Sequence, residues 1–239
     1  MAAAKVRRLL LQVRNITVHI LKNWLRGGAD AVIVREFDMQ TREFVDGGFE
    51  LPEAKTQIAW DNEDTVLVGT DFGPGSLTES GYPRIIKRWR RGQPLAEAET
   101  VFEGEITDVS VGGGADRTPG YERIHVSRSL DFFNHELYEV RGKELIRIDV
   151  PTDAGTSTHR EWLLVKLRTD WEVGGTSYPA GSLLAANYDE FLSGTVDLTT
   201  VFEPDEHTFL SHYSWTRNKV VMVTLADVAS RVEIVTPGT

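Results

Sequence analysis

The sequence predicts an all-β protein, and three observations lead to that prediction. Short runs rich in β-branched and aromatic residues recur along the chain after residue 27. Turns rich in Gly, Pro, Asp and Asn separate these runs, and few stretches have the apolar periodicity of a helix. The length of 239 residues fits one large β domain, since such folds reach about 200 to 250 residues as a single unit.

Fifteen short runs are predicted to be strands. In chain order they cover residues 31–37, 57–60, 65–70, 84–89, 98–103, 106–111, 122–127, 134–140, 144–149, 161–167, 182–188, 199–202, 207–215, 219–225 and 231–236. So many short strands with few helices are typical of a sandwich, a barrel or a propeller.

The spacing of the strands favours the propeller. Trp60 and Trp215 each end a predicted strand, and a short polar turn then leads into the next apolar strand, which is typical of a hairpin. Propeller repeats are about 40 to 50 residues long. Residues 27–239 therefore predict a partial β-propeller of about four to five blades, each a four-stranded antiparallel sheet.

Residues 1–26 form a basic leader that we do not assign to a fold. The segment has six Lys or Arg and no acid, and its uncharged runs are far shorter than the ~20 residues of a membrane span. It also lacks a clear secretory signal, although a transit peptide stays open. A helical stripe and a strand fit it equally well; the stripe is Val6, Leu10, Val13, Leu21 and Trp24, and the strand is Ile16 to Val18 with Ile20. A shifted reading frame or an artificial start would also explain such a leader.

Composition and charge narrow the classes of function. The whole chain has a net charge of -10, and the part after the leader is more acidic still, so we expect no nucleic acid partner. We expect no membrane partner either, because no uncharged run is long enough to span a bilayer. The sequence has no cysteine, which excludes disulfides and thiolate sites and suits a reducing, cytoplasmic location.

The segment 68–85, VGTDFGPGSLTESGYPRI, resembles the β-propeller of the prolyl oligopeptidase family of serine peptidases. Further segments resemble bacterial members of the family in the same order along the chain; they are 27–38, 48–55, 127–129, 171–184 and 217–225. No single segment is diagnostic, and their ordered succession carries the resemblance.

The resemblance implies a seven-bladed propeller that covers a separate α/β-hydrolase domain and admits only short peptides. This chain would then be a truncated middle part of the propeller, a gate that is not catalytic alone. Its partners would be short proline-containing peptides only when it is joined to a hydrolase domain, and self-association through unpaired blade edges is a further expectation. The alternatives are a free-standing propeller that binds a peptide or protein, and a small-molecule enzyme such as a propeller glycosidase.

We predict no catalytic, cofactor-binding or metal-binding residue. A serine hydrolase of this class needs Gly-x-Ser-x-Gly on a strand-to-helix turn, and the sequence has none. Ser76 and Ser182 follow glycines but are expected to be loop or strand-start residues. Of the six histidines, only His207 and His212 are close in sequence, and five residues along a strand would put them on opposite faces.

The remaining polar motifs are expected to be structural. Acidic clusters at 61–64, 103–105 and 203–206 could serve glycoside hydrolysis but more often solvate turns. The glycines 112–114 and 174–175 lack the context of a phosphate-binding loop, and we expect them in turns with positive φ or in flexible loops. The basic segment 87–91, KRWRR, is predicted to be a solvated edge strand rather than a segment that binds nucleic acid.

Overall fold

The computed structural model describes residues 19–25 and 30–238, and for 19–25 only the backbone is considered. The strands in chain order are β1 (His19–Leu25), β2 (Val32–Asp38), β3 (Glu43–Phe44), β4 (Glu50–Ala54), β5 (Gln57–Asn62), β6 (Thr65–Gly69), β7 (Ile85–Arg90), β8 (Glu99–Glu103), β9 (Ser110–Asp116), β10 (Arg123–Ser129), β11 (His135–Arg141), β12 (Glu144–Arg147), β13 (Gly155–His159), β14 (Trp162–Lys166), β15 (Trp171–Val173), β16 (Thr176–Tyr178), β17 (Leu183–Asn187), β18 (Thr199–Phe202), β19 (Thr208–Trp215), β20 (Val220–Ala226) and β21 (Ala229–Val235). A 3₁₀ turn, Leu95–Glu97, and one short helix, α1 (Tyr188–Leu192), complete the described elements.

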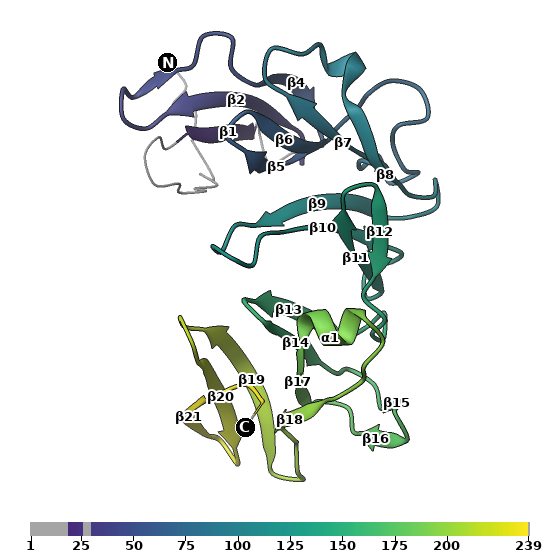
Figure 1. The fold of residues 1–239 in the computed structure, drawn as a ribbon, viewed down its shortest axis with the longest axis vertical. Coiled ribbons are helices and arrows are strands. Elements are labelled where there is room, and N and C mark those ends of the chain that lie inside the picture. Colours follow the sequence, from purple (N-terminus) through teal and green to yellow (C-terminus); the bar gives the residue numbers. More distant parts are fainter. Residues whose placement is uncertain (1–18, 26–29, 239) are drawn as a thin grey trace. The chain divides into compact units, whose positions relative to one another are not determined.

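Nearly all of these strands belong to small antiparallel sheets made of consecutive strands (Figure 1). The four-stranded sheets are β1-β2-β3 with β4 beside β2, β5-β6-β7-β8, β12-β11-β10-β9, and β13-β14-β17-β18. A three-stranded sheet, β19-β20-β21, and the β15-β16 hairpin follow. Four-stranded antiparallel sheets that succeed one another along the chain are the blade repeat of a β-propeller.

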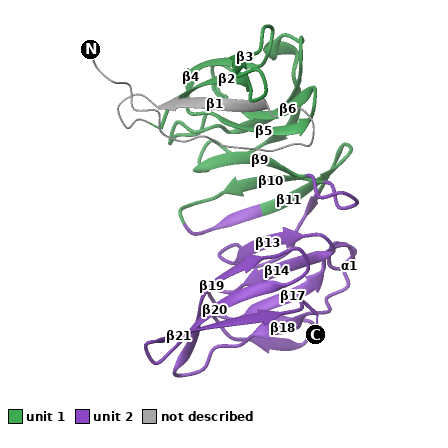
Figure 2. Cartoon of the chain, turned by 90° about the vertical axis from the view of Figure 1, so that its left-hand side faces the viewer, with its two compact units in different colours: residues 1–116, 123–132, 137–145 green, residues 117–122, 133–136, 146–239 purple. Residues whose placement is uncertain are grey.

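The chain divides into two compact units, which Figure 2 colours separately. Unit 1 comprises residues 1–116, 123–132 and 137–145, and unit 2 comprises residues 117–122, 133–136 and 146–239. Each unit has its own hydrophobic core.

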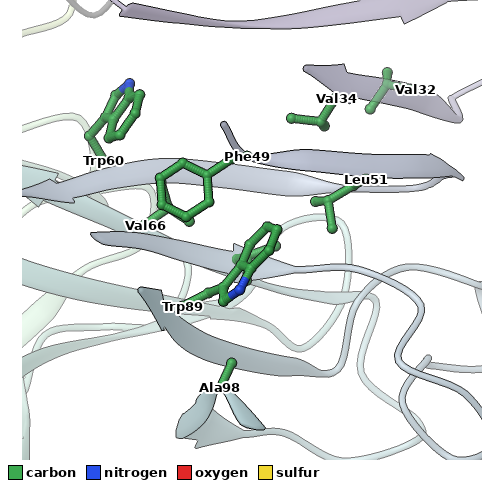
Figure 3. Packing of buried hydrophobic residues seen from close by; sticks show 9 residues of the cluster. Val32, Val34, Phe49, Leu51, Trp60, Val66, Trp89 and Ala98 are labelled. Carbon is green, nitrogen blue, oxygen red and sulfur yellow. The ribbon is translucent and has the colours of Figure 1, made fainter. Parts of the chain in front are cut away.

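The core of unit 1 forms around aromatic side chains from three strands or their ends. The ring of Phe49 lies 5.6 Å from that of Trp60 and 4.9 Å from that of Trp89, both in edge-on geometry (Figure 3). Strand β6 is buried along its whole length, because β5 and β7 flank it and its side chains pack on both faces. A second cluster of unit 1 contains Leu67, Ile86 and Val111.

The core of unit 2 lies between the sheets β13-β14-β17-β18 and β19-β20-β21. Leu164, Leu183 and Met222 are almost fully buried there. Strand β20 alternates buried and half-buried residues, as a strand with one face on a core does. Within the described part of the chain, no helix is long and apolar enough to span a membrane.

The structure confirms most of the expected strands to within one or two residues and corrects others. The expected strand 106–111 is wrong at its start, since residues 105–108 form a turn and β9 begins at Ser110. Six short strands were not expected or were left open: β1, β3, β4, β13, β15 and β16. Strand β1 falls within the leader segment 1–26 and pairs with β2, and residues 1–18 of that segment lie outside the described residues.

Candidate functional site

The loop between β6 and β7, residues 70–84, carries the segment that resembles the peptidase family. Its own side chains hold it in one conformation. Ser76 Oγ donates to the carbonyl of Gly73 at 2.7 Å and accepts from the N–H of Phe72 at 2.8 Å. Gly73 and Gly75 have φ of 107° and 82°, values that only glycine adopts readily. Ser76 is therefore a buried turn-closing residue, as expected, and not an exposed nucleophile.

Arg84 ties this loop to the end of β8. Its Nη2 and Nε donate to the carbonyl of Gly75 at 2.7 and 3.0 Å, and its Nη1 donates to the carbonyl of Gly104 at 2.8 Å. The same Nη1 lies 2.8 Å from a carboxylate oxygen of Glu103. One guanidinium thus fixes two loops, using the planar array of donors that lysine lacks.

Tyr82 holds the other side of the loop. Its hydroxyl donates to Oδ2 of Asp30 at 2.7 Å, and Lys55 Nζ lies 3.9 Å from the centre of the tyrosine ring. The hydrogen bond to Asp30 raises the pKa of Tyr82, with smaller contributions from burial and the carboxylate charge. Lys55 Nζ also donates to the carbonyl of Ser80 at 3.1 Å, so the loop is braced by a cation as well.

A buried carboxylate braces the neighbouring turn between β8 and β9. Asp108 accepts from Arg128 Nε at 2.8 Å and from the N–H of Glu105 at 2.7 Å. The adjacent residue, Val109, accepts from Thr78 Oγ1 at 3.0 Å, which links this turn to the β6–β7 loop. We call the loop and the turn together the rim of unit 1, and hydrogen bonds join the two.

A bidentate ion pair of unit 1 joins Glu36 of β2 to Arg91, just after β7. The two guanidinium nitrogens of Arg91 lie 2.7 and 2.9 Å from the two carboxylate oxygens, and the Glu36 side chain has no exposed surface. Glu36 also accepts from the N–H of Phe49, and Arg91 contacts Asp64 at 3.1 Å. The pair raises the pKa of Arg91, chiefly through the hydrogen bonds to Glu36.

The prediction that residues 87–91 form a solvated edge strand is wrong. Strand β7 lies between β6 and β8, and Trp89 is buried in the core. The basic side chains of this segment form contacts within unit 1. Arg88 pairs with Asp61 at 3.0 Å, and Lys87 lies over the ring of Phe72. These pairs could not be inferred from the charge run alone, because their acids come from other strands.

The glycine run 112–114 lies in strand β9, so the expectation of turns or flexible loops is wrong there. A Cβ on Gly112 would lie 2.2 Å from Gln57 Oε1, and one on Gly113 would lie 3.1 Å from Ile86. These glycines let β9 approach β5 and the core closely. Gly174 and Gly175, in contrast, have φ of 59° and 78° in the β15–β16 turn, as expected.

The structure also shows where the other candidates lie. Ser182 is buried at the start of β17, and its hydroxyl has no hydrogen-bond partner. His207 lies before β19 and His212 follows a bulge in it, so simple alternation does not relate them. Asp205 accepts from the N–H of His207, a hydrogen bond that lowers the pKa of Asp205. Among residues 30–238, no cluster of His, Asp and Glu could hold a metal ion.

A small, open hollow lies beside Glu36. Arg35, Phe44, Val45 and residues 47–50 also line it. Glu36 is its buried charged group, and Arg91 and Phe49 already engage that carboxylate. The hollow therefore offers no buried charge to a ligand.

Sequence reasoning missed Glu36 and Asp108, two buried carboxylates of unit 1 that form ion pairs. Glu36 occupies an inward position in a strand whose apolar residues alternate. A buried acid needs a cation as a partner, so this position was the available signal for an ion pair. For Asp108 the sequence has no comparable signal.

Comparison with known proteins gives a consistent picture. An uncharacterized peptidase of Sinorhizobium fredii is 35% identical over 216 residues, which covers 86% of this chain and 30% of that protein. An uncharacterized peptidase of Rickettsia prowazekii is 29% identical over 224 residues and is covered to 31%. The solved structure of a post-proline cleaving enzyme from Rickettsia typhi matches with a TM-score of 0.83 and 26% identity, over 96% of this chain and 36% of that one. This chain is a β-propeller region of the prolyl oligopeptidase family.

More distant structures agree with this propeller assignment in fold alone. A prolyl endopeptidase matches with a TM-score of 0.68 at 13% identity, and oligopeptidase B from Trypanosoma brucei matches with 0.60 at 15%. No protein-family model matches the chain. The chain spans about 30% of the length of the curated relatives, and the prediction of a partial propeller is confirmed.

Proposed function

We propose that this propeller region gates a post-proline-cleaving serine peptidase and does not cleave peptides by itself. The observation that carries the proposal is the match of 96% of the chain to 36% of a post-proline cleaving enzyme. The 239 residues supply the propeller strands but no Gly-x-Ser-x-Gly turn on which a nucleophile would stand.

The hydrogen-bonded rim of unit 1 supports the gating role. A gate selects by size only if its walls hold their positions while a peptide passes, because a soft wall yields to larger substrates. Arg84 and Asp108 fix the loops of this rim through several hydrogen bonds each. A narrow entrance also excludes water from the chemistry that follows. The proposed substrates are short peptides that contain proline.

The absence of cysteine supports a cytoplasmic location as part of this proposal, since thiol-free chains need no oxidising compartment. Among the residues that the structure describes, no helix could span a membrane.

The test is a measurement on the purified 239-residue chain. We expect no hydrolysis of a chromogenic Gly-Pro substrate and no labelling by a serine-directed phosphonate. The Rickettsia typhi enzyme serves as the positive control under the same conditions. Turnover that copurifies with the folded chain through a second purification would overturn the non-catalytic assignment.

A further inference from the structure

Strand β9, in the middle of the chain, has one edge that pairs with no described strand. It is the first strand of the four-stranded sheet β12-β11-β10-β9, and β10 is its neighbour on the other side. The strand belongs to unit 1 along its whole length, and residues 112–116 are partly exposed. Water and small ligands therefore have access to this strand.

The backbone groups of two residues on this edge have no partner. The N–H of Val111 donates to the carbonyl of Pro83 at 2.8 Å, so it points away from β10. Because backbone groups of an antiparallel strand point alternately to its two sides, those of Gly113 and Ala115 point away from β10 as well. Among the described residues, these N–H and C=O groups form no hydrogen bond. The edge thus offers two donors and two acceptors to an added strand.

Gly114, which lies between these two residues, is not required by the packing of the chain itself. The neighbouring glycines at 112 and 113 make room for side chains of other strands, but a Cβ on Gly114 would meet nothing within 4 Å. Its φ is not positive, so the backbone conformation does not require glycine either. A glycine within a strand costs stability and often marks a place where another backbone or a ligand approaches closely.

We propose that this edge of β9 binds a short extended peptide in antiparallel orientation, with a proline opposite Gly114 and its two flanking residues hydrogen-bonded to Gly113 and Ala115. The class of peptide rests on the proposed function. The residue opposite Gly114 turns its own N–H away from β9, so the N–H that proline lacks costs no hydrogen bond. The two Cα atoms of such a pair lie about 4.5 Å apart with their side chains on the same face, and the proline ring fills the open space at Gly114.

A blocked peptide, acetyl-Ala-Ala-Pro-Ala-Ala-amide, tests the hydrogen bonds. In an NMR titration of the ¹⁵N-labelled chain we expect the largest shifts at the amides of Gly113 and Ala115. N-methylation of the second or the fourth peptide residue removes an N–H that donates to β9 and should raise the dissociation constant at least ~10-fold. N-methylation of the fifth residue is the matched control and should change the constant less than ~2-fold, because that N–H points away from β9.

A substitution at Gly114 tests the position of the proline ring. Gly114→Val should raise the dissociation constant at least ~10-fold, because the new side chain occupies the space of the ring. The same variant should weaken binding of the all-alanine pentapeptide less. Gly155→Val is the matched control in β13, since a Cβ there makes ordinary contacts of 3.8 Å with Lys166 and its φ is not positive. Circular dichroism verifies that both variants fold.

Saturable shifts at Gly113 and Ala115 that are lost on N-methylation of the second or fourth residue and in Gly114→Val support the proposal. An intact peptide that shifts neither amide at millimolar concentration overturns it, and so does binding that is equally strong in a folded Gly114→Val variant. Equal weakening by all three N-methylations also overturns it. These results leave the proposed function untouched, whereas cleavage of the peptide by the purified chain would overturn the non-catalytic assignment.

Discussion

Arg91 and Glu36 are 55 residues apart in sequence and form a two-pronged ion pair, with Nη1 2.7 Å from Oε2 and Nη2 2.9 Å from Oε1. Glu36 belongs to β2 of the first sheet, and Arg91 follows β7 of the second. The guanidinium also lies 4.9 Å from the centre of the Phe49 ring, at the middle of the aromatic core. The pair therefore joins two successive sheets of unit 1 where they pack.

Replacing Arg91 with Met should destabilise the chain strongly. Glu36 would stay fully buried without its cation, and breaking a buried pair by removing one partner costs about 3–5 kcal/mol. The measurement is the free energy of unfolding in urea. Arg90→Met is the matched control, since Arg90 is exposed and should change stability by less than about 0.5 kcal/mol.

The double variant Glu36→Leu with Arg91→Met separates charge from packing. Removing both charges should recover most of the loss, because the uncompensated carboxylate is gone. An Arg91→Met protein as stable as the original would contradict the assignment of this pair.

Gly69→Ala should destabilise unit 1 by about 1–3 kcal/mol. A Cβ at this position would lie 2.7 Å from Ile86 Cδ1 and 2.9 Å from Pro83 Cβ, and the proline ring cannot turn away. Gly114→Ala is the control, because a Cβ there meets nothing within 4 Å and alanine costs less entropy than glycine in a strand. Urea unfolding of both variants checks the prediction, and an equal effect at the two positions would refute it.

Val228→Gly should stabilise the chain by about 1 kcal/mol. The turn between β20 and β21 has positive φ at both central residues, 51° at Asp227 and 112° at Val228, and a β-branched residue is strained there. Val228 is 98% exposed, so little packing is lost. Val228→Ala keeps the Cβ and should give a smaller gain; if alanine matches glycine, backbone strain is not the cause.

Acid should weaken the chain partly through His125. Burial lowers the pKa of His125, with Arg123 acting in the same direction and the carboxylates of Glu139 and Asp116 opposing it. The folded state therefore binds a proton less readily than the unfolded state. The contribution to stability is complete above the ordinary pKa near 6.5 and is lost as the pH falls through the lowered value.

His125→Gln should remove this component. We expect the decrease in unfolding free energy between about pH 7.5 and pH 5.5 to be smaller in the variant than in the original protein. His207→Gln is the control, because His207 is exposed. A steeper pH dependence in His125→Gln would contradict the role of burial.

Local patterns predicted the fold well where a strand and its adjoining turn have a clear signal in their own residues. The turn after Trp215 is a case: Thr216 N–H donates to the carbonyl of Lys219, which closes the hairpin at the expected place. The short strands β3 and β4 were missed because their two to five residues carry acids and a proline, and pairing with β2 alone holds them. Such strands have too little local signal to be recognised.

The structural roles of the polar residues were harder to predict. Arg88 and Arg91 read as a charge run in sequence, yet their carboxylates come from other strands at separations of 27 and 55 residues. Gly112 and Gly113 of β9 likewise have a reason only in the side chains that approach them, Gln57 at Gly112 and Ile86 at Gly113. Contacts that are distant in sequence decide these roles, and a single sequence does not contain them.

The most direct test of the gating account is a graft. The propeller segment of the Rickettsia typhi post-proline cleaving enzyme that matches this chain is replaced by residues 30–238, and hydrolysis of a short Gly-Pro peptide is compared with that of a long unfolded proline-containing polypeptide. The account predicts a folded chimera that cleaves the short peptide and still rejects the long one. A folded, active chimera that cleaves both equally well would contradict it.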